Sequence, residues 1–383
     1  MATSQNRILT THVGSLPRSQ RVVDFLFAKE NQEPYDSTAF DQCMTDSVAE
    51  VVKRQQEAGI DIVSDGETSK ISYATYVKDR LSGFAGDSPR NAPADLKQFP
   101  SFLERLAKSG GTPKYARPQC VDEITLKHDE SLHKDIANLQ AAAAQYGISN
   151  AFMNAASPGV IALFLPNAYY PSYEKYLEVL AEVMRVEYET IATAGLQLQL
   201  DCPDLALSRH MLFTDKSDAE FLALAEQNLE ALNHALRNVP AEQCRLHICW
   251  GNYEGPHTCD IAMETVFPLL MKAKAKYLLF ENANPRHAHE DSVFQQHKKA
   301  IPDDKVLIPG VLDTTTNFVE HPQVVARRIL RFANIVGRER VIAGTDCGFG
   351  TFAGFGAVDP NICYAKLSAL REGVDIASKQ LWR

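Results

Sequence analysis

Two His-x-Cys pairs occur in the segment RLHICWGNYEGPHTCD, residues 245–260. The first pair is His247 and Cys249, and the second pair is His257 and Cys259. Imidazole and thiolate groups are both good ligands for zinc, so either pair could contribute to a metal centre. Which pair does so depends on the ligands that the fold brings beside it, and therefore on the elements that position these residues.

Short apolar segments recur along the whole chain and predict buried parallel strands, because their apolar runs are continuous rather than alternating. There are eight of them, at 9–15, 60–67, 149–159, 196–201, 244–249, 276–281, 305–311 and 340–346. Amphipathic helices are expected between them, for example over 172–194, 218–237 and 322–336. Strands that alternate with helices indicate a parallel sheet. Eight such units favour a closed (β/α)8 TIM barrel, an α/β fold.

A doubly wound open sheet is the alternative architecture, but no G-x-G-x-x-G motif follows the first predicted strand. Residues 68–148 are too many for one crossover connection. We expect them to form an inserted excursion, or lid, between strands 2 and 3, with a hairpin over 116–126. The expected organisation is one catalytic barrel domain over residues 1–383.

The composition excludes several classes of function. Hydrophobic residues make up 45% and charged residues 23% of the chain, which is typical of a soluble globular protein. The net charge of −9 without a basic block argues against a nucleic-acid partner. No apolar run approaches the about 18 residues of a membrane span, and the N-terminus lacks a secretory signal. We expect a cytoplasmic protein with reduced cysteines. Four of them are expected to be small buried hydrophobes: Cys43, Cys120, Cys244 and Cys363.

Nearly every predicted strand finishes on a polar or ionisable side chain. In chain order these are Ser15, Glu67, Ser157, Asp201, His247 with Cys249, Glu281, Asp313, and Asp346 with Cys347. In a (β/α)8 barrel the reactive groups lie at the carboxyl ends of the strands. Charged side chains are rarely buried unless they are paired, so this cluster predicts a functional site.

Four of these side chains form a set of zinc ligands. His247 and Cys249 lie two residues apart on a predicted strand, so their side chains point to the same side. Glu281 ends the next strand, and Cys347 follows the last strand. One nitrogen, two thiolates and one carboxylate suit tetrahedral Zn²⁺, which is therefore the predicted cofactor.

The ligand set also indicates the kind of reaction. Two thiolates and a carboxylate give Zn²⁺ an electron-rich environment, with a net charge of about −1. Such a centre suits the deprotonation of a bound thiol, which then becomes a nucleophile at neutral pH. The sequence therefore favours an enzyme that transfers an alkyl group to a substrate thiol over a hydrolase.

The other histidines and cysteines of this region are expected to lie away from the ligand set. His257 and Cys259 follow a glycine- and proline-rich stretch, so we place them on a loop beyond the strand. His287 and His289 likewise lie past the strand that ends at Glu281. We expect all four to face solvent or to lie behind the metal ligands.

This pattern resembles the catalytic barrel of the cobalamin-independent methionine synthase family, in a short, single-barrel form. THVGSLPRS (11–19) is similar to the first strand of that barrel, and DGE (65–67) and QLDCPDL (198–204) are similar to its substrate-binding strands. The resemblance covers essentially the whole chain, with 68–148 the weakest part. It implies zinc-dependent transfer of a methyl group to the thiol of homocysteine, which forms methionine.

The resemblance also implies roles for single residues. The implied ligands of zinc are His247, Cys249, Glu281 and Cys347. The implied substrate-binding residues are Ser15, Glu67, Asp201 and Asp313. Two carboxylates among them suit the ammonium group of homocysteine. The segment GVLDTTTNF has Thr315 where the family has a histidine for proton delivery to the departing folate, so methylfolate and a methyl-corrinoid both stay open as donors.

Two alternatives remain. CWGNYEGPH (249–257) and GTDCGFGTF (344–352) are also similar to epoxyalkane:coenzyme M transferases, which alkylate a different thiol at the same zinc set. That reaction needs a cation for the sulfonate of coenzyme M. The candidates by position are Arg18, Arg209 and Arg286. The other alternative is a non-enzymatic zinc protein, because four protein ligands also close a structural zinc site.

Overall fold

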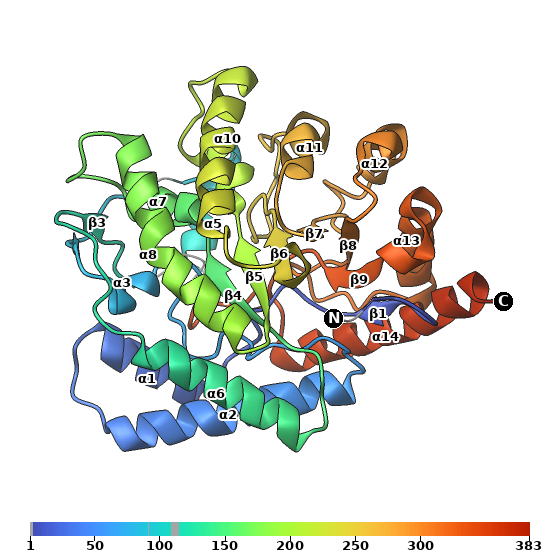
Figure 1. The fold of residues 1–383 in the computed structure, drawn as a ribbon, viewed down its shortest axis with the longest axis horizontal. Coiled ribbons are helices and arrows are strands. Elements are labelled where there is room, and N and C mark those ends of the chain that lie inside the picture. Colours follow the sequence, from blue (N-terminus) through green and yellow to red (C-terminus); the bar gives the residue numbers. More distant parts are fainter. Residues whose placement is uncertain (1–2, 91, 109–114) are drawn as a thin grey trace.

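Seven parallel strands curl into one sheet at the centre of the molecule (Figure 1). The structure is a computed structural model that describes residues 3–90, 92–108 and 115–383. The order of the strands in the sheet is β1-β9-β8-β7-β6-β5-β4. Their bounds are β1 (Leu9–Thr10), β4 (Phe152–Ala156), β5 (Gln197–Asp201), β6 (Cys244–His247), β7 (Tyr277–Phe280), β8 (Val306–Leu312) and β9 (Ile342–Thr345).

Helices surround the sheet (Figure 1). The α-helices are α1 (Gln20–Glu30), α2 (Ser37–Glu57), α3 (Val77–Arg80), α4 (Ala94–Gln98), α5 (Pro100–Lys108), α6 (Glu130–Gln145), α7 (Pro158–Phe164), α8 (Tyr173–Thr193), α9 (Ser208–Met211), α10 (Asp218–Ala235), α11 (Met263–Met271), α12 (Asp291–Gln296), α13 (Pro322–Val336) and α14 (Pro360–Leu381). Short 3-10 helices are η1 (Pro203–Leu205), η2 (Ala241–Gln243), η3 (Lys298–Ala300) and η4 (Arg338–Arg340).

Residues 61–64 occupy the eighth position of the ring, between β1 and β4. The backbone N–H of Ile62 donates to the carbonyl oxygen of Thr10 over 3.1 Å. On the other side Val63 forms a parallel bridge with Ala151. All eight predicted strand segments therefore take part in one closed ring, and the predicted (β/α)8 TIM barrel is confirmed.

Successive residues of each strand pack into two different cores. In β7 the side chains of Tyr277 and Leu279 belong to the cluster inside the barrel. Leu278 and Phe280 belong to the larger cluster between the sheet and the helices. A parallel strand is thus buried on both faces, which is why the sequence shows continuous apolar runs instead of alternation.

Local capping explains where the long helices begin and end. Ser172 accepts a hydrogen bond from the backbone N–H of Lys175 at the start of α8. Ser217 and Glu220 form a capping box at the start of α10. Pro322 begins α13, and Gly337, with φ +89°, follows its last turn. The predicted helix over 322–336 coincides with α13.

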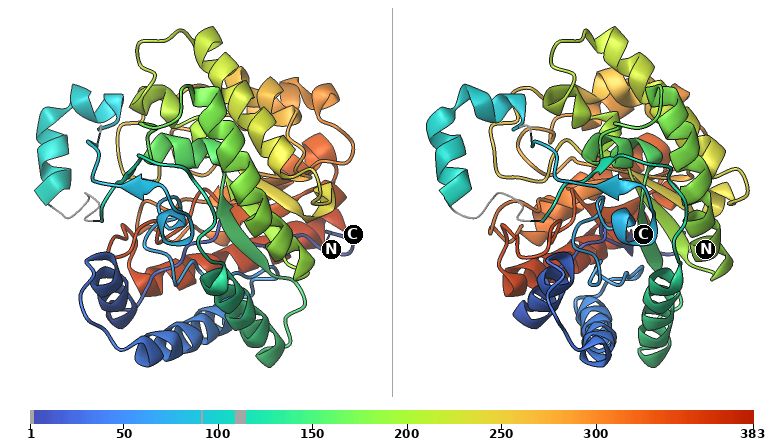
Figure 2. Two further views of the ribbon diagram at one scale, coloured as in Figure 1. Left: turned by 60° about the vertical axis from the view of Figure 1, so that its left-hand side comes forward. Right: turned by 90° about the vertical axis from the view of Figure 1, so that its left-hand side faces the viewer.

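The segment 68–148 holds α3, a two-stranded sheet, α4, α5 and α6. Figure 2 shows α4 and α5, in cyan, standing to one side of the barrel. The predicted hairpin over 116–126 is wrong, because β3 (Gln119–Cys120) pairs with β2 (Phe84–Ala85), which comes earlier in the chain. The single catalytic domain and the lid stay predictions, and residues 91 and 109–114 of the segment lie outside the described residues.

A membrane span is not found. None of the helices in the described parts of the chain is both long enough and apolar enough to cross a bilayer.

A buried ion pair joins this segment to the barrel and allows a test of its anchoring. Arg80 lies 2.7 Å from a carboxylate oxygen of Asp135 and 2.9 Å from one of Glu187, with all three side chains less than one tenth exposed. We expect Arg80→Met to lower the free energy of unfolding by about 3–5 kcal/mol, because two buried carboxylates lose their countercharge. Chemical denaturation measures this loss.

Lys108→Met is the matched control, because it removes the exposed pair with Glu104. It should cost less than about 1 kcal/mol. Equal losses for the two variants would contradict an anchoring role of Arg80.

Candidate functional site

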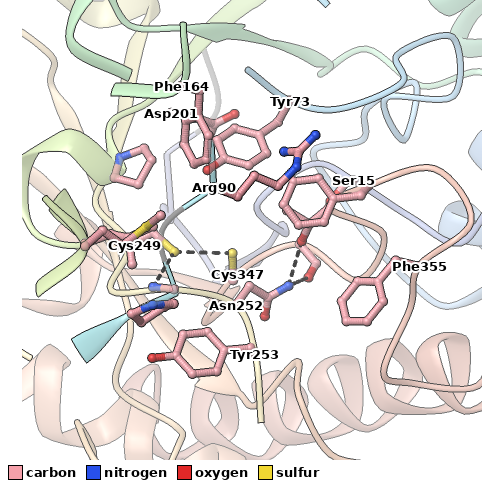
Figure 3. A pocket seen from close by; sticks show the side chains of 18 of the residues that line it. Ser15, Tyr73, Arg90, Phe164, Asp201, Cys249, Asn252, Tyr253, Cys347 and Phe355 are labelled. Carbon is pink, nitrogen blue, oxygen red and sulfur yellow. Dashed lines mark hydrogen bonds between the residues drawn. The ribbon is translucent and has the colours of Figure 1, made fainter. Parts of the chain in front are cut away.

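A cavity of about 320 Å³ opens where the carboxyl ends of the strands meet (Figure 3). Most of the predicted site residues line it. They are Ser15, Glu67, Asp201, His247, Cys249 and Cys347. The structure therefore brings six of the eight predicted side chains to one cavity, from segments that lie far apart in the sequence.

The parallel register explains this convergence. Asp201, the last residue of β5, is the backbone partner of His247, the last residue of β6. His247 in turn is paired with Leu279 of β7. Because Leu279 packs inside the barrel, the residues at the same level of β5 and β6 also point inward. Cys249, two residues beyond His247, keeps this orientation and lines the cavity.

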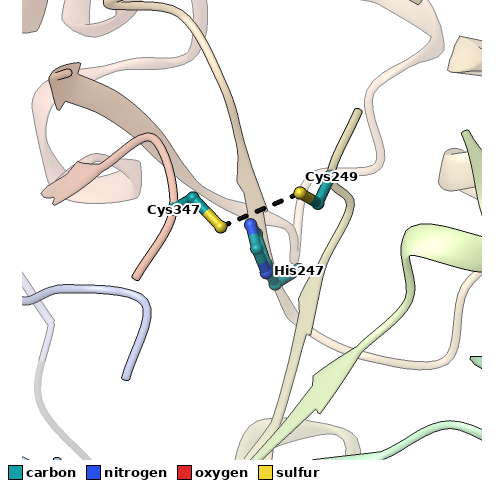
Figure 4. A group of neighbouring side chains, drawn as sticks. All are labelled: His247, Cys249 and Cys347. Carbon is teal, nitrogen blue, oxygen red and sulfur yellow. Dashed lines mark hydrogen bonds between the residues drawn. The ribbon is translucent and has the colours of Figure 1, made fainter. Parts of the chain in front are cut away.

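Three potential metal ligands meet in the wall of this cavity (Figure 4). The donor atoms of His247, Cys249 and Cys347 all lie within 4.8 Å of one another, and all three side chains are buried. The two sulfur atoms are 3.8 Å apart. Two thiolates on one tetrahedral Zn²⁺, at about 2.3 Å each, lie about 3.8 Å from one another. The residues present therefore fit a zinc ion.

The surroundings of the two thiols make a cation necessary if they are to ionise. The hydrogen bond with Cys347 and burial raise the pKa of Cys249 well above its usual value. The backbone N–H of Gly251 donates to the sulfur of Cys249 over 3.2 Å. Without a cation the thiol stays protonated at neutral pH, whereas a bound metal ion deprotonates a coordinating thiol outright.

His247 is held by a carboxylate behind it. Its Nδ1 atom lies 3.2 Å from a carboxylate oxygen of Asp201. Burial lowers the pKa of His247, but the hydrogen bond with Asp201 and the negative charges around the ring together outweigh this effect, so the pKa is raised. A carboxylate on one ring nitrogen orients a metal-binding histidine and leaves the other nitrogen, Nε2, for the metal.

Glu67 carries an unpartnered carboxylate oxygen into the site. Its Oε2 atom is buried and has no hydrogen-bond partner within the described part of the chain. Burial raises the pKa of Glu67 to about 7, although the positive charge of Lys70 lowers it. The residue also has φ +54°, a left-handed conformation that is rare for a side chain of this kind. A buried carboxylate oxygen without a partner can accept a hydrogen bond from the cationic group of a ligand.

Glu281 and Asp313 are not among the described residues that line the cavity. The carboxylate of Glu281 accepts hydrogen bonds from the backbone N–H of Trp250 over 2.9 Å and from the side chain of Asn284 over 2.8 Å. Asp313 accepts hydrogen bonds from the backbone and hydroxyl of Thr315. Their roles as metal ligand and substrate-binding residue stay predictions.

Asp346 connects two of the loops that carry the site. One of its carboxylate oxygens accepts the backbone N–H groups of Asn282 and Ala283, each over 2.8 Å. The other oxygen accepts the N–H of Asn284 over 2.7 Å. These three hydrogen bonds fix the loop after β7 to the end of β9. They therefore fix the position of Glu281 relative to that of Cys347. The sequence marked Asp346 as a strand-end residue but did not show this role.

The remaining histidines and cysteines occupy different environments. His289 is exposed, whereas His287 is buried, with its ring centroid 4.6 Å from that of Trp250. Cys259 is partly exposed. Four cysteines are buried, as predicted: Cys43, Cys120, Cys244 and Cys363.

The structure adds residues that the sequence did not single out. Arg90, from the segment 68–148, lines the cavity and lies over the ring of Tyr115. Asn252 donates a hydrogen bond to the carbonyl oxygen of Gly348 over 2.7 Å, and so links two loops of the cavity wall (Figure 3). Aromatic side chains supply much of the remaining lining: Tyr73, Phe164, Tyr253, Phe352 and Phe355. The unexplained length of the excursion was a signal in the sequence for Arg90, Tyr73 and Tyr115 only, because the other residues lie outside 68–148.

The three arginines considered for a sulfonate lie elsewhere, as far as the described lining shows. Arg18 is half-buried and donates to the carbonyl oxygens of Gly350 and Glu67. Arg209 pairs with an aspartate at a helix start, and Arg286 is exposed.

Comparison with known proteins gives consistent matches. Residues 8–92 match the family model described as the catalytic domain of cobalamin-independent synthase. The chain is 24% identical over 379 residues to the methionine synthase of Saccharolobus solfataricus. The matched region covers 98% of this chain and 96% of that protein.

Solved structures share the fold. A B12-independent methionine synthase from Shewanella sp. W3-18-1, in complex with selenomethionine, has a TM-score of 0.73 at 19% identity and covers 98% of this chain and 99% of that chain. A putative vitamin-B12 independent methionine synthase from Listeria monocytogenes has a TM-score of 0.65 at 18% identity, with 97% and 99% covered. The family model over residues 8–92 and the curated relative thus make the chain similar to cobalamin-independent methionine synthases, and the solved structures show that it shares their fold.

Proposed function

We propose that this protein transfers a methyl group to the thiol of homocysteine and so forms methionine, with Zn²⁺ held by His247, Cys249 and Cys347. The observation that carries the proposal is the position of this ligand cluster. It lies in the wall of the same cavity into which Glu67 brings an unpartnered carboxylate oxygen. The similarity of the chain to cobalamin-independent methionine synthases supports the same reaction.

The geometry supports the following roles for the chain's own residues. A zinc ion would supply the positive charge that keeps a substrate thiol ionised at neutral pH. The three protein ligands leave a fourth position, as in catalytic zinc sites. Glu67 and Asp201 would bind the ammonium group of the substrate, and the backbone around Ser15 would bind its carboxylate. The substrate sulfur forms its bond to the methyl carbon while the bond from that carbon to the donor breaks, and the electron pair stays on the donor.

The surroundings of Thr315 bear on the methyl donor. Its hydroxyl group donates to Asp313 over 2.8 Å. A hydroxyl offers no acid with a pKa near neutrality. This position therefore favours a donor whose leaving group needs no proton, such as a methyl-corrinoid, over methylfolate.

The segment 68–148 contributes one wall of the cavity, through Arg90, Pro93 and Leu96. We therefore keep it as a proposed lid within a single catalytic domain. Closing an apolar wall over the strand ends would exclude water from the reacting sulfur.

The proposed reaction is tested with homocysteine, added zinc, and either methylfolate or a methyl-corrinoid as donor. We expect the purified protein to form methionine with at least one donor. Cys347→Ser should lower the rate by more than about 100-fold, because it removes a metal ligand and not merely an outer contact.

Cys363→Ser is the matched control, since Cys363 is also buried but lies in α14 and not in the cavity lining. It should keep both zinc and activity. If the zinc-loaded protein formed no methionine with either donor, the proposal would fail.

A second prediction tests whether Glu281 is a metal ligand, as the sequence predicts, or lies behind the other three ligands, as its hydrogen bonds with Trp250 and Asn284 favour. We expect Glu281→Gln to weaken zinc binding by about 10–100-fold, as changes behind the ligands do, while zinc still binds at millimolar concentration. Competition with a chelator measures the affinity. A loss of zinc as complete as in Cys347→Ser would instead make Glu281 a ligand in its own right.

A third prediction uses the raised pKa of Glu67, about 7. The carboxylate is ionised above this pH, so the KM for homocysteine should fall as the pH rises from about 6 to about 8. Glu67→Gln should raise the KM by about 10-fold or more and remove this part of the pH dependence, because a charge-assisted hydrogen bond is lost.

The control substrate is 4-mercaptobutyrate, which has the same thiol and carboxylate but no ammonium group. Its KM should be the same for both proteins at every pH. A Glu67-dependent KM for this compound would refute the assignment of Glu67 to the ammonium group.

A further inference from the structure

Behind the cavity wall, the loops that follow β6 and β7 meet at the side chain of Asp260. Its Oδ2 atom lies 2.9 Å from Nδ1 of His257 and 3.0 Å from Nε2 of His287. These three donor atoms lie within 4.8 Å of one another. The exposed fractions of the side chains are 2% for Asp260, 12% for His257 and 3% for His287.

The outer contacts of the two histidines indicate which nitrogen of each ring carries the proton. The other nitrogen then presents a lone pair to Asp260. Nε2 of His257 lies 3.0 Å from the carbonyl oxygen of Tyr253, which can only accept a hydrogen bond. Nδ1 of His287 lies 2.7 Å from a carboxylate oxygen of Glu290, which also accepts. If each ring carries its single proton there, both inner nitrogens present lone pairs to a carboxylate. A cation between them would remove this repulsion, and a carbonyl or carboxylate on the outer nitrogen is the usual support of a metal-bound histidine.

His210 provides an independent observation at the same place. Its side chain is 2% exposed, and neither ring nitrogen has a hydrogen-bond partner among the residues that the structure describes. The Oδ1 atom of Asp260 is also buried without such a partner, and it lies 3.4 Å from Nδ1 of His210. Buried polar groups in proteins are rarely left unpaired, so these atoms point to a missing ligand.

We propose that His210, His257, Asp260 and His287 form a second metal site, for a divalent transition-metal ion such as Zn²⁺. Three imidazoles and one carboxylate, without a thiolate, suit such an ion. Four protein ligands close the site, which makes it structural and not catalytic.

The position of this site indicates what it does. The ring of His257 stacks on Tyr253, with centroids 4.4 Å apart, and Tyr253 lines the substrate cavity. The Tyr253 hydroxyl and the backbone N–H of His257 both donate to Asp95 of α4. A metal ion bound to His257 would therefore hold one wall of the cavity and its contact with the segment 68–148.

Protons are the competing occupants of the cluster. Burial lowers the pKa of His287, but its hydrogen bonds with Asp260 and Glu290 outweigh this and raise the pKa to about 10. Two imidazolium groups could then balance the two carboxylates without a metal. A measurement of bound metal separates the two arrangements.

The test is the zinc content of the full-length protein after loading with Zn²⁺ and removal of free metal. We expect two zinc ions per chain in the unchanged protein and one in Asp260→Asn. His289→Gln is the matched control, since His289 is exposed and close in sequence, and it should keep two. Cys347→Ser should also hold one, because it loses the other site.

Titration with Co²⁺ identifies which site is filled. The site with two thiolates gives a near-ultraviolet sulfur-to-cobalt charge-transfer band, whereas the histidine site gives only the visible bands of the metal. Asp260→Asn should keep the charge-transfer band and lose the additional visible bands, and Cys347→Ser should show the reverse. Failure of this inference is thus distinguishable from failure of the zinc site at Cys347.

His257→Gln serves as a second variant in case Asp260→Asn does not fold, since His257 is the most exposed of the loop ligands. It should also bind one zinc ion, with an unchanged circular dichroism spectrum. A single zinc ion in the unchanged protein, lost only with Cys347→Ser, would overturn the proposal. Two zinc ions in folded Asp260→Asn would overturn it as well.

Discussion

The parallel hydrogen-bonded register of the barrel strands is the constraint on which the site depends. Because neighbouring strands run in the same direction, all their carboxyl ends meet at one rim of the barrel. The pairing of Asp201 with His247 sets these two residues at the same level. A slip by one residue would turn His247 toward the helices and an apolar neighbour toward the cavity. The burial of both faces of the sheet in separate cores opposes such a slip.

Polar side chains inside the rim form hydrogen bonds that also fix the loops that follow the strands. Asn154 of β4 donates to the carbonyl oxygen of Val13 and to Asp201, and so joins three segments of the ring. Asp346 holds the backbone of the loop after β7. These buried hydrogen bonds form only when the segments lie in this arrangement, so they favour it over others. These hydrogen bonds therefore help to fix the relative positions of His247, Cys249 and Cys347.

The two clusters of potential metal ligands differ in their surroundings and in the types of their donor atoms. The cluster with Cys249 and Cys347 lines the cavity and carries two groups that a cation must ionise. The cluster around Asp260 lies behind Tyr253 and contains no thiol. In our proposals the first cluster activates the substrate sulfur, and the second holds the wall against which the substrate lies. The segment 68–148 contacts this wall through Asp95.

The sequence by itself predicted most of the fold and part of the candidate site. Continuous apolar runs and helix caps predicted eight strand segments and the long helices, because both depend on local patterns of residues. Residue type and strand-end position also singled out His247, Cys249 and Cys347, since the carboxyl ends of parallel strands must converge. Only the tertiary structure decided the partners of Glu281 and Asp313, which depend on contacts with loop backbone. It also decided the pairing of β3 with β2, the place of Arg90 and the meeting of His210 with Asp260. These are contacts between segments remote in the chain, and no local pattern of residues encodes which remote loops will touch.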